Sequence, residues 1–284
     1  MGIAKILRRA LGFAPASPHY FFARHALVVR ITHWINALCL LILLMSGLQI
    51  FNAHPALYWG KSSDFAHPLL SLTAFSGDNG LVGTTQIGPW HFDTTGTLGA
   101  SDVDGVRMPR GFPAWATLPG PQWLAMGRLW HFAFAWLLVA NAALFMTYAF
   151  MRRHMQRDLL PTKDDIAHLP REIVDHVQLR FPKGEAAKHY NGLQKLAYCF
   201  VIFVLGPLIV LTGLTMSPMM DSAFPALLWI FHGRQSARTI HFLCAFSFLG
   251  FFVVHIIMVI LSGSWNNLRS MITGRYVIEE RADG

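Results

Sequence analysis

Charged residues are scarce in this sequence. Asp, Glu, Lys and Arg make up 13% of its 284 residues, while hydrophobic residues make up 54%. Soluble globular proteins are about a quarter charged. A chain with so few charges has too little polar surface to cover an apolar core of matching size. An integral membrane protein is therefore the economical interpretation.

Cysteine is also rare, and the motifs that would give it a redox role are missing. The three cysteines lie within apolar runs, at Cys39, Cys199 and Cys244. We interpret them as buried thiols. The sequence has no C-x-x-C-H motif for c-type haem and no iron–sulfur spacing. Residues 1–30 lack an apolar segment followed by a small-residue cleavage site, so we expect no cleavable signal peptide. No internal repeat is evident.

Four apolar segments are long enough to cross a bilayer as helices. None of them contains Asp or Glu, and they cover about 29–51, 127–150, 194–216 and 237–262. Pro207 should distort the third segment, because proline cannot donate the helical hydrogen bond. We predict an all-α fold, an integral membrane four-helix bundle, as a single domain over residues 1–284.

The distribution of positive charge predicts the orientation of these spans. Lys and Arg number five in residues 1–30, eight in 151–192 and three in 263–284, against three in 51–126 and one in 217–236. The positive-inside rule then places both termini and the loop between the second and third spans in the cytoplasm. The net charge of +8 therefore reflects topology. With no nucleic-acid-binding motif, we expect the lipid bilayer, and no nucleic acid, as a partner.

Two connections between the spans differ in character. The outer connection, about 52–126, is rich in Gly, Pro, Thr and Trp. It predicts an ordered but irregular cap with turns, with room for a short hairpin, that is too small for a catalytic domain and suited to docking. The cytoplasmic loop, about 151–193, contains a short amphipathic helical pattern at 170–181.

Four of the fourteen histidines lie inside the spans. An imidazole in hydrocarbon is costly and usually functional. With the orientation above, His131 and His241 lie near the outer ends of their spans, and His33 and His255 lie near the inner ends. The 14-residue spacing between His241 and His255 corresponds to a rise of about 21 Å and a rotation of about 40°. Both imidazoles therefore point to roughly the same side of their helix.

Two levels with two imidazoles each match the ligand requirement of two bis-histidine haems in a bundle. An arginine stands three residues before three of these histidines, on the same helix face. Such arginines could bind haem propionates, and they are Arg30, Arg128 and Arg238. The alternatives are four histidines that only pack, and a histidine-lined proton or metal transporter without haem. The transporter would lack the Asp or Glu that membrane proton relays commonly use.

These motifs resemble the bacterial dihaem cytochrome b561 superfamily, in particular thiosulfate reductase-like cytochrome b subunits. This group is related to the cytochrome b subunits of formate dehydrogenase and nickel–iron hydrogenase. The resemblance covers about residues 20–275 and rests on RITHWINA, GRLWHFAFAW, YNGLQKLAY, GPLIVLTGLTMSP and the His241–His255 pair. It implies two haem b groups in a bacterial inner-membrane protein. The outer haem would bind His131 and His241, and the inner haem would bind His33 and His255.

The resemblance also implies a role in electron transport. Such subunits carry electrons between the quinone pool and a catalytic redox subunit. In this branch the partner is often a periplasmic molybdopterin enzyme. The direction of electron flow stays open. One alternative is a stand-alone quinone oxidoreductase that uses a small diffusible electron donor, and another is a bare membrane anchor.

Quinone binding requires an apolar slot with a few hydrogen-bond donors. The inner boundary of the spans supplies six candidates, and these are Arg24, His25, Asn36, Asn191, Gln194 and Lys195. Each could donate a hydrogen bond to a quinone carbonyl. The competing interpretation is that they are ordinary interface anchors and helix caps. A quinone site on the outer side stays open as well.

Overall fold

The computed structural model describes residues 19–78, 80–178, 180 and 190–279. Its internal contacts divide the chain into two compact units. The cap unit comprises Thr32–Thr147 and Phe200–Val253. The terminal unit comprises Met1–Ile31, Tyr148–Cys199 and Val254–Gly284.

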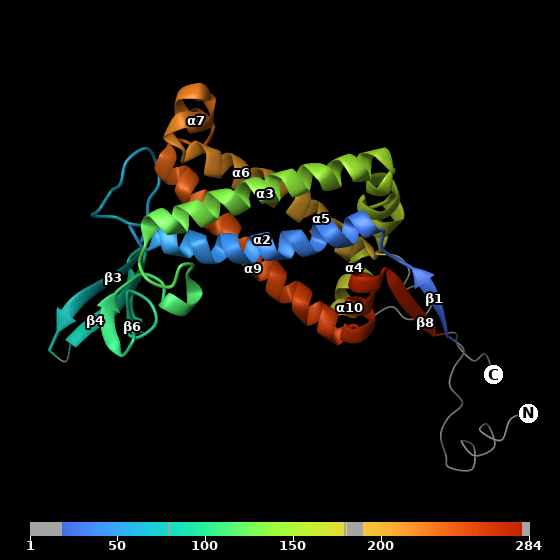
Figure 1. Ribbon diagram of the computed structural model, residues 1–284, viewed down its shortest axis with the longest axis horizontal. Helices are drawn as coiled ribbons and strands as arrows, with labels where there is room; N and C mark the ends of the chain where they lie inside the picture. Colours follow the sequence, from blue (N-terminus) through green and yellow to red (C-terminus); the bar gives the residue numbers. More distant parts are fainter. Residues whose placement is uncertain (1–18, 79, 179, 181–189, 280–284) are drawn as a thin grey trace, which may run out of the picture. The chain divides into compact units, whose positions relative to one another are not determined.

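Four helices are long and apolar enough to cross a membrane, which confirms the predicted spans to within a few residues. The third is built from two helices joined by a π-helical segment, Val201–Leu205. Figure 1 labels the helices, which are α2 (Leu27–Phe51), α3 (Leu124–Met151), α5 (Gly192–Phe200), α6 (Gly206–Thr215) and α9 (Arg234–Leu261).

The expected distortion of the third span takes the form of this π-helical segment. Pro207 has no N–H to donate to the carbonyl of Phe203, and its ring would crowd that carbonyl in a regular α-helix. A wider π turn directly before the proline accommodates both effects.

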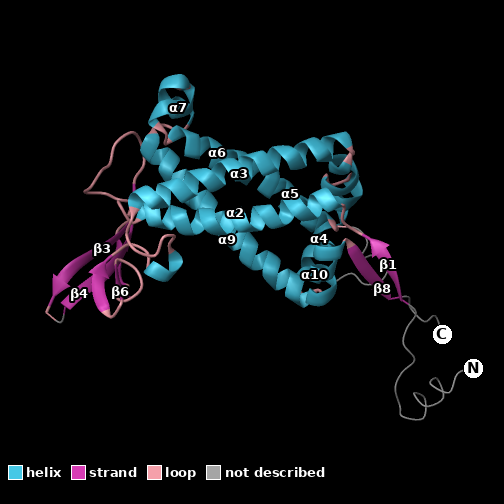
Figure 2. Ribbon diagram, viewed as in Figure 1, coloured by secondary structure: helices cyan, strands magenta, loops and turns pink. Residues whose placement is uncertain are grey.

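The cap corrects the all-α prediction, because much of it is β-sheet (Figure 2). One antiparallel sheet has the order β2-β3-β4-β5, and a separate hairpin pairs β6 with β7. The strands are β2 (Ala56–Leu57), β3 (Leu70–Gly77), β4 (Gly80–Ile87), β5 (Trp90–Asp93), β6 (Ala100–Val103) and β7 (Val106–Pro109).

Glycines allow the chain before β6 to lie directly against the sheet. A Cβ atom at Gly83 would stand 2.3 Å from the carbonyl oxygen of Leu98, and one at Gly99 would stand 2.2 Å from that of Thr73. Gly99 also has a φ of 77°, a backbone conformation that residues other than glycine rarely adopt. The glycine content that suggested irregular turns therefore serves close backbone packing in an ordered cap.

A buried arginine ties the cap to the end of α2. Arg110 is 4% exposed. It donates hydrogen bonds to the carbonyls of Phe112 and Gly120, both at 2.7 Å, and to Thr117 Oγ1 at 2.7 Å. It also donates to Gln49 Oε1 of α2 at 3.3 Å. Burial lowers the pKa of the Arg110 guanidinium, and these four acceptors engage its Nε and Nη2 groups.

The start of α9 is joined to the cap as well. Ser236 Oγ accepts a hydrogen bond from the Gly60 N–H at 2.7 Å, and Thr239 Oγ1 donates to the Tyr58 carbonyl at 2.6 Å. An apolar cluster lies between cap and helices, with buried residues Phe51, Leu57 and Leu72. The short elements that complete this unit are a 3₁₀ turn (Ala114–Ala116), α7 (Pro218–Ala223) and α8 (Ala226–Ile230).

In the terminal unit, the two ends of the described chain pair as antiparallel strands. β1 (His19–Ala23) lies beside β8 (Arg275–Glu279), and α10 (Ser264–Thr273) holds β8 through Asn266. Asn266 donates to the Val277 carbonyl at 2.8 Å and accepts from its N–H at 2.9 Å. The pairing brings the two ends of the described chain together, which agrees with an even number of spans.

The loop between the second and third spans folds into α4 (Lys163–Val177), preceded by a π-helical turn (Met155–Leu159). The amphipathic helix predicted at 170–181 therefore begins earlier than expected, and residues 179 and 181 lie outside the described part of the chain. The start is defined by Thr162, whose side chain and that of Asp165 form a reciprocal capping box.

Replacing Arg110 should loosen the cap. In Arg110→Met, Gln49 Oε1 and two backbone carbonyls lose a buried donor, so we expect a loss of roughly 2–4 kcal/mol of stability. Thermal unfolding in detergent and limited proteolysis of the cap measure this. Arg107→Met is the matched control, because Arg107 pairs with Asp102 at the surface and its side chain is 41% exposed. Equal stability of the two variants would show that Arg110 does not anchor the cap.

Candidate functional site

Two of the predicted site residues face each other in the cap unit. The imidazole centroids of His131, on α3, and His241, on α9, are 6.2 Å apart, and the ring planes are inclined by 59°. Two imidazoles that bind one metal from opposite sides have centroids roughly 6 Å apart, because each metal–nitrogen bond is about 2 Å long and each nitrogen lies about 1 Å from its ring centre. The spacing therefore fits a shared metal ion.

The hydrogen bonds of His241 determine which ring nitrogen is available to a metal. Its Nδ1 lies 3.0 Å from the carbonyl oxygen of Ile209 and 3.1 Å from Thr212 Oγ1. A carbonyl oxygen can only accept, so Nδ1 carries the proton. Nε2 then keeps its lone pair, as a neutral imidazole ligand requires. The residues present therefore fit a bis-histidine haem.

His131 is held in the same manner. Its Nδ1 lies 3.1 Å from Ser46 Oγ of α2, and its ring interacts with the backbone of Leu43. Sequence reasoning missed both Ser46 and Thr212. A sequence signal does exist, because each of these hydroxyl residues is followed by a glycine within an apolar span. The sequence does not show, however, which histidine each of these segments contacts.

The other two span histidines lie in different units. His33, on α2, belongs to the cap unit and is partly buried next to Trp34, with ring centroids 5.3 Å apart. His255, on α9, belongs to the terminal unit and is also partly buried. Their pairing at an inner haem stays a prediction.

The three arginines predicted to bind propionates differ in their surroundings. Arg238 donates to the carbonyl of His54 in the cap, and its guanidinium lies 5.3 Å from the Phe51 ring. Arg128 is exposed and lies over Phe132. The buried Nε of Arg30 has no hydrogen-bond partner among the described residues. Arg30 and Arg128 are therefore better placed for a propionate than Arg238, which anchors the cap.

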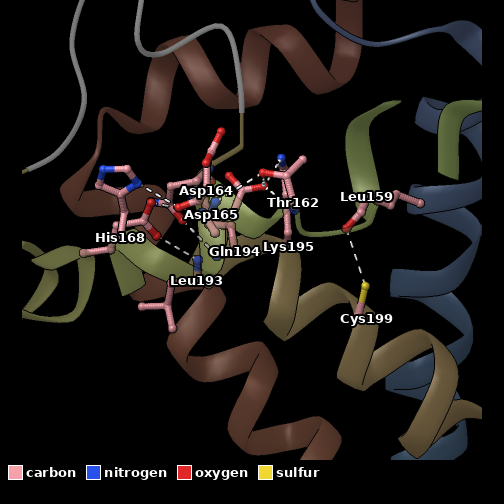
Figure 3. A network of polar contacts seen from close by, with 12 residues as sticks. Leu159, Thr162, Asp164, Asp165, His168, Leu193, Gln194, Lys195 and Cys199 are labelled. Atoms are coloured by element: carbon pink, nitrogen blue, oxygen red, sulfur yellow. Dashed lines mark hydrogen bonds and ion pairs between the residues drawn. The ribbon is translucent and has the colours of Figure 1, made fainter. Parts of the chain in front are cut away.

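Lys195, a predicted quinone ligand, is bound to α4 (Figure 3). Its Nζ lies 2.7 Å from Asp165 Oδ2, and both side chains are largely buried. Burial alone would raise the pKa of the Asp165 carboxyl. Hydrogen bonds from Lys195 and Thr162 outweigh burial and lower the pKa to about 2. This ion pair favours the structural interpretation of Lys195.

Asn191 and Gln194 also have structural partners. Asn191 Oδ1 accepts from the Gln194 N–H at 2.8 Å, and Gln194 Oε1 accepts from the Asn191 N–H at 3.3 Å. Glu172 of α4 accepts from the first N–H groups of α5, those of Gly192 and Leu193. These contacts cap α5 and attach it to α4.

Asn36 is likewise engaged, within the cap unit. Its Oδ1 accepts from Asn141 Nδ2 of α3 at 2.7 Å, and the same Asn141 group donates to the Thr32 carbonyl at 2.8 Å. Asn36 therefore contributes to the packing of α2 against α3.

The remaining two quinone candidates lie in an aromatic cluster of the terminal unit. Arg24 lies over Tyr276 at 4.6 Å and over Tyr190 at 5.8 Å, and its buried Nε has no hydrogen-bond partner within the described chain. His25 Nδ1 is 3.4 Å from the Tyr190 hydroxyl, and Tyr190 packs against Tyr198. Burial raises the pKa of Tyr190 above its ordinary value, so the hydroxyl stays protonated.

The comparison with protein families agrees with this arrangement. The model of the family described as prokaryotic cytochrome b561 matches residues 24–98 and 104–274. The chain belongs to the prokaryotic cytochrome b561 family. The resemblance inferred from the sequence is thereby confirmed. This cytochrome is a membrane-bound haem protein that transfers electrons, and its four apolar helices indicate a bacterial inner-membrane protein.

One curated relative aligns along most of the cytochrome. It is the putative protein-methionine-sulfoxide reductase subunit YedZ1 of Azospira oryzae. The two are 25% identical over 240 residues, which is 84% of this chain and 91% of the relative. The comparison with solved structures found no match.

The Asp165–Lys195 pair should contribute to stability in a pH-dependent way. A carboxyl whose pKa is lowered by folding stabilises the protein above its unfolded pKa of about 4, and this contribution disappears as the pH falls from about 4 towards 2. We expect Asp165→Asn to lower stability by about 1–2 kcal/mol at pH 7, allowing for solvent screening. The difference in stability between Asp165→Asn and wild type should become smaller as the pH falls from 5 to 3.

Thermal unfolding of the purified protein across this pH range tests the expectation. Asp164→Asn is the matched control, because Asp164 is the exposed neighbour of Asp165. A pH-independent difference between Asp165→Asn and wild type would contradict the lowered pKa.

Proposed function

We propose that this cytochrome transfers electrons from membrane quinol to a catalytic subunit on the outer side through two haem b groups. His131 and His241 bind one haem, and His33 and His255 bind the other. The facing pair on α3 and α9, with the Nδ1 proton assigned by hydrogen bonding, is the observation that carries this proposal.

A haem with two histidine ligands supplies one-electron exchange at its iron and offers no open coordination position to a substrate. The residues of the chain provide the rest. Nε2 of His131 and of His241 would hold the iron of one haem, the apolar spans exclude water, and Arg128 and Arg30 would balance the negative propionates. The single helix α9 contains both His241 and His255, and their spacing supports two sites on the same side of that helix.

Within this proposal, the quinol head group binds beside Arg24, His25 and Tyr190. The buried donor of Arg24 and the ring of His25 can hydrogen-bond to quinone oxygens, and His25 can take up a proton when quinol is oxidised. The other predicted candidates already bond to neighbouring helices, so the structure supports a narrower set than the sequence suggested.

The partner is proposed to be a periplasmic reductase of the molybdopterin type that the family resemblance implies. The name of the relative, a protein-methionine-sulfoxide reductase subunit, supports electron flow from quinol to such an enzyme. The cap exposes the large aromatic side chains of Trp59, Trp90 and Trp115. Exposed aromatic residues are typical of protein interfaces, and this favours a protein partner over a small diffusible donor.

The orientation is proposed from the charges of the loops. The basic segments at both ends and between the second and third spans place the termini in the cytoplasm. The pairing of β1 with β8 supports a common side for both ends.

Haem content tests the ligand assignment. A dithionite-reduced minus oxidised spectrum and haem quantification should give two b haems per wild-type chain. His131→Ala and His255→Ala should each lose one haem and keep much of the other, because each removes an axial ligand from a different site. His232→Ala, at an exposed position, is the control and should keep both. A folded wild-type protein without haem would overturn the proposal.

Quinol oxidation kinetics test the quinone site. His25→Ala should reduce the rate of haem reduction by a short-chain quinol by roughly 10-fold or more, because proton transfer by a positioned side chain contributes about 10²–10⁴-fold. Lys195→Met should leave the rate near wild type in protein that retains its fold, because Lys195 bonds to Asp165. A slow rate in Lys195→Met together with a near-wild-type rate in His25→Ala would instead indicate that quinol binds at Lys195.

A further inference from the structure

Two helix pairs of the cap unit share one local arrangement. The sequence SGLQ at 46–49 in α2 adjoins His131, and TGLT at 212–215 in α6 adjoins His241. In both, a buried hydroxyl residue and the glycine after it contact the histidine of the neighbouring helix. Ser46 and Thr212 are both 0% exposed. The molecule thus contains a local repeat that the sequence did not reveal.

The two hydroxyl groups have the same hydrogen-bonding role. Ser46 Oγ donates to the carbonyl of Ile42 at 2.6 Å, and Thr212 Oγ1 donates to that of Leu208 at 2.7 Å. Each hydroxyl has a single proton, which is used within its own helix. Its oxygen can therefore only accept from the histidine. The backbone contacts match as well, because Leu43 and Ile209 stand three residues before Ser46 and Thr212.

The glycines set the distance between each histidine ring and its neighbouring helix. A Cβ atom at Gly47 would lie 3.3 Å from His131 Cε1, and one at Gly213 would lie 3.3 Å from His241 Cε1. Both separations are tighter than ordinary contact, so a larger residue would push the ring away from its hydroxyl partner.

We propose that Ser46 and Thr212 are positioning residues that orient the two axial histidines of the outer haem and lower its reduction potential. The inference rests on the proposed function, because it takes His131 and His241 as ligands. A hydrogen bond accepted from Nδ1–H makes the imidazole a stronger donor to the metal. A stronger donor stabilises oxidised iron more than reduced iron, so loss of the hydroxyl raises the potential.

Redox titration of purified Thr212→Val and Ser46→Ala, followed in the visible spectrum, tests this. At a fixed ambient potential, we expect the ratio of reduced to oxidised outer haem to rise roughly three- to tenfold in each variant. A tenfold rise corresponds to about 59 mV for one electron. The potential of the inner haem should stay unchanged. The electron paramagnetic resonance signal of the outer haem should also shift, since it depends on ring orientation.

Two further variants separate positioning from packing. Thr212→Ser keeps the hydroxyl and should restore the wild-type potential. Thr215→Val is the matched control on the same helix, because Thr215 is also 0% exposed and donates to the carbonyl of Leu211 at 2.8 Å. It should leave the potential of the outer haem unchanged.

The outcomes distinguish this inference from the proposed function. Wild-type protein without an outer haem, or His131→Ala that retains it, would overturn the ligand assignment itself. Full haem content with unchanged potential and resonance signal in Thr212→Val and Ser46→Ala would overturn only the positioning role. If one variant fails to fold, the other decides, because the two hydroxyls act on the same haem through different histidines.

Discussion

The arrangement of the helices around His131 and His241 depends on the hydrogen bond that Nδ1 of each makes within an apolar bundle. An imidazole has two nitrogens, and leaving either without a partner in a low-dielectric environment is costly. For His131 and His241, a hydroxyl of the neighbouring helix bonds to Nδ1, and the backbone of the same helix also contacts the ring. Nε2 is then available for the iron of the proposed haem. The packing of α2 against α3 and of α6 against α9 is therefore coupled to the chemistry of the ligands.

The cap is built onto the same end of the helices that carries these histidines. Arg110 and Gln49 bond the cap to α2, while Thr239 and Arg238 bond it to α9. A protein that docks on the cap would therefore contact a structure that is hydrogen-bonded to α2 and α9. This arrangement explains why Arg238, despite its spacing from His241, serves the cap.

The terminal unit separates residues that the sequence had grouped together. Asn191, Gln194 and Lys195 hold α4 against the start of α5, whereas Arg24 and His25 lie among tyrosines. All five are polar residues at a predicted membrane boundary, so composition alone could not separate them. Their roles differ because Asp165 and Glu172, which are distant in sequence, reach one group and not the other.

Hydrophobic length by itself determined the four spans, and the resemblance of the motifs around the histidines to a known family indicated the family. These features are local, since helix geometry converts sequence distance into depth and direction. Only the tertiary structure decided that the cap is a β-sheet, that Ser46 and Thr212 bond to the histidines, and that Lys195 bonds to Asp165. Each of these contacts joins segments from 29 to 85 residues apart or depends on strand pairing. A local sequence pattern cannot specify partners that are distant in sequence, because only the packing of helices or the pairing of strands brings them together.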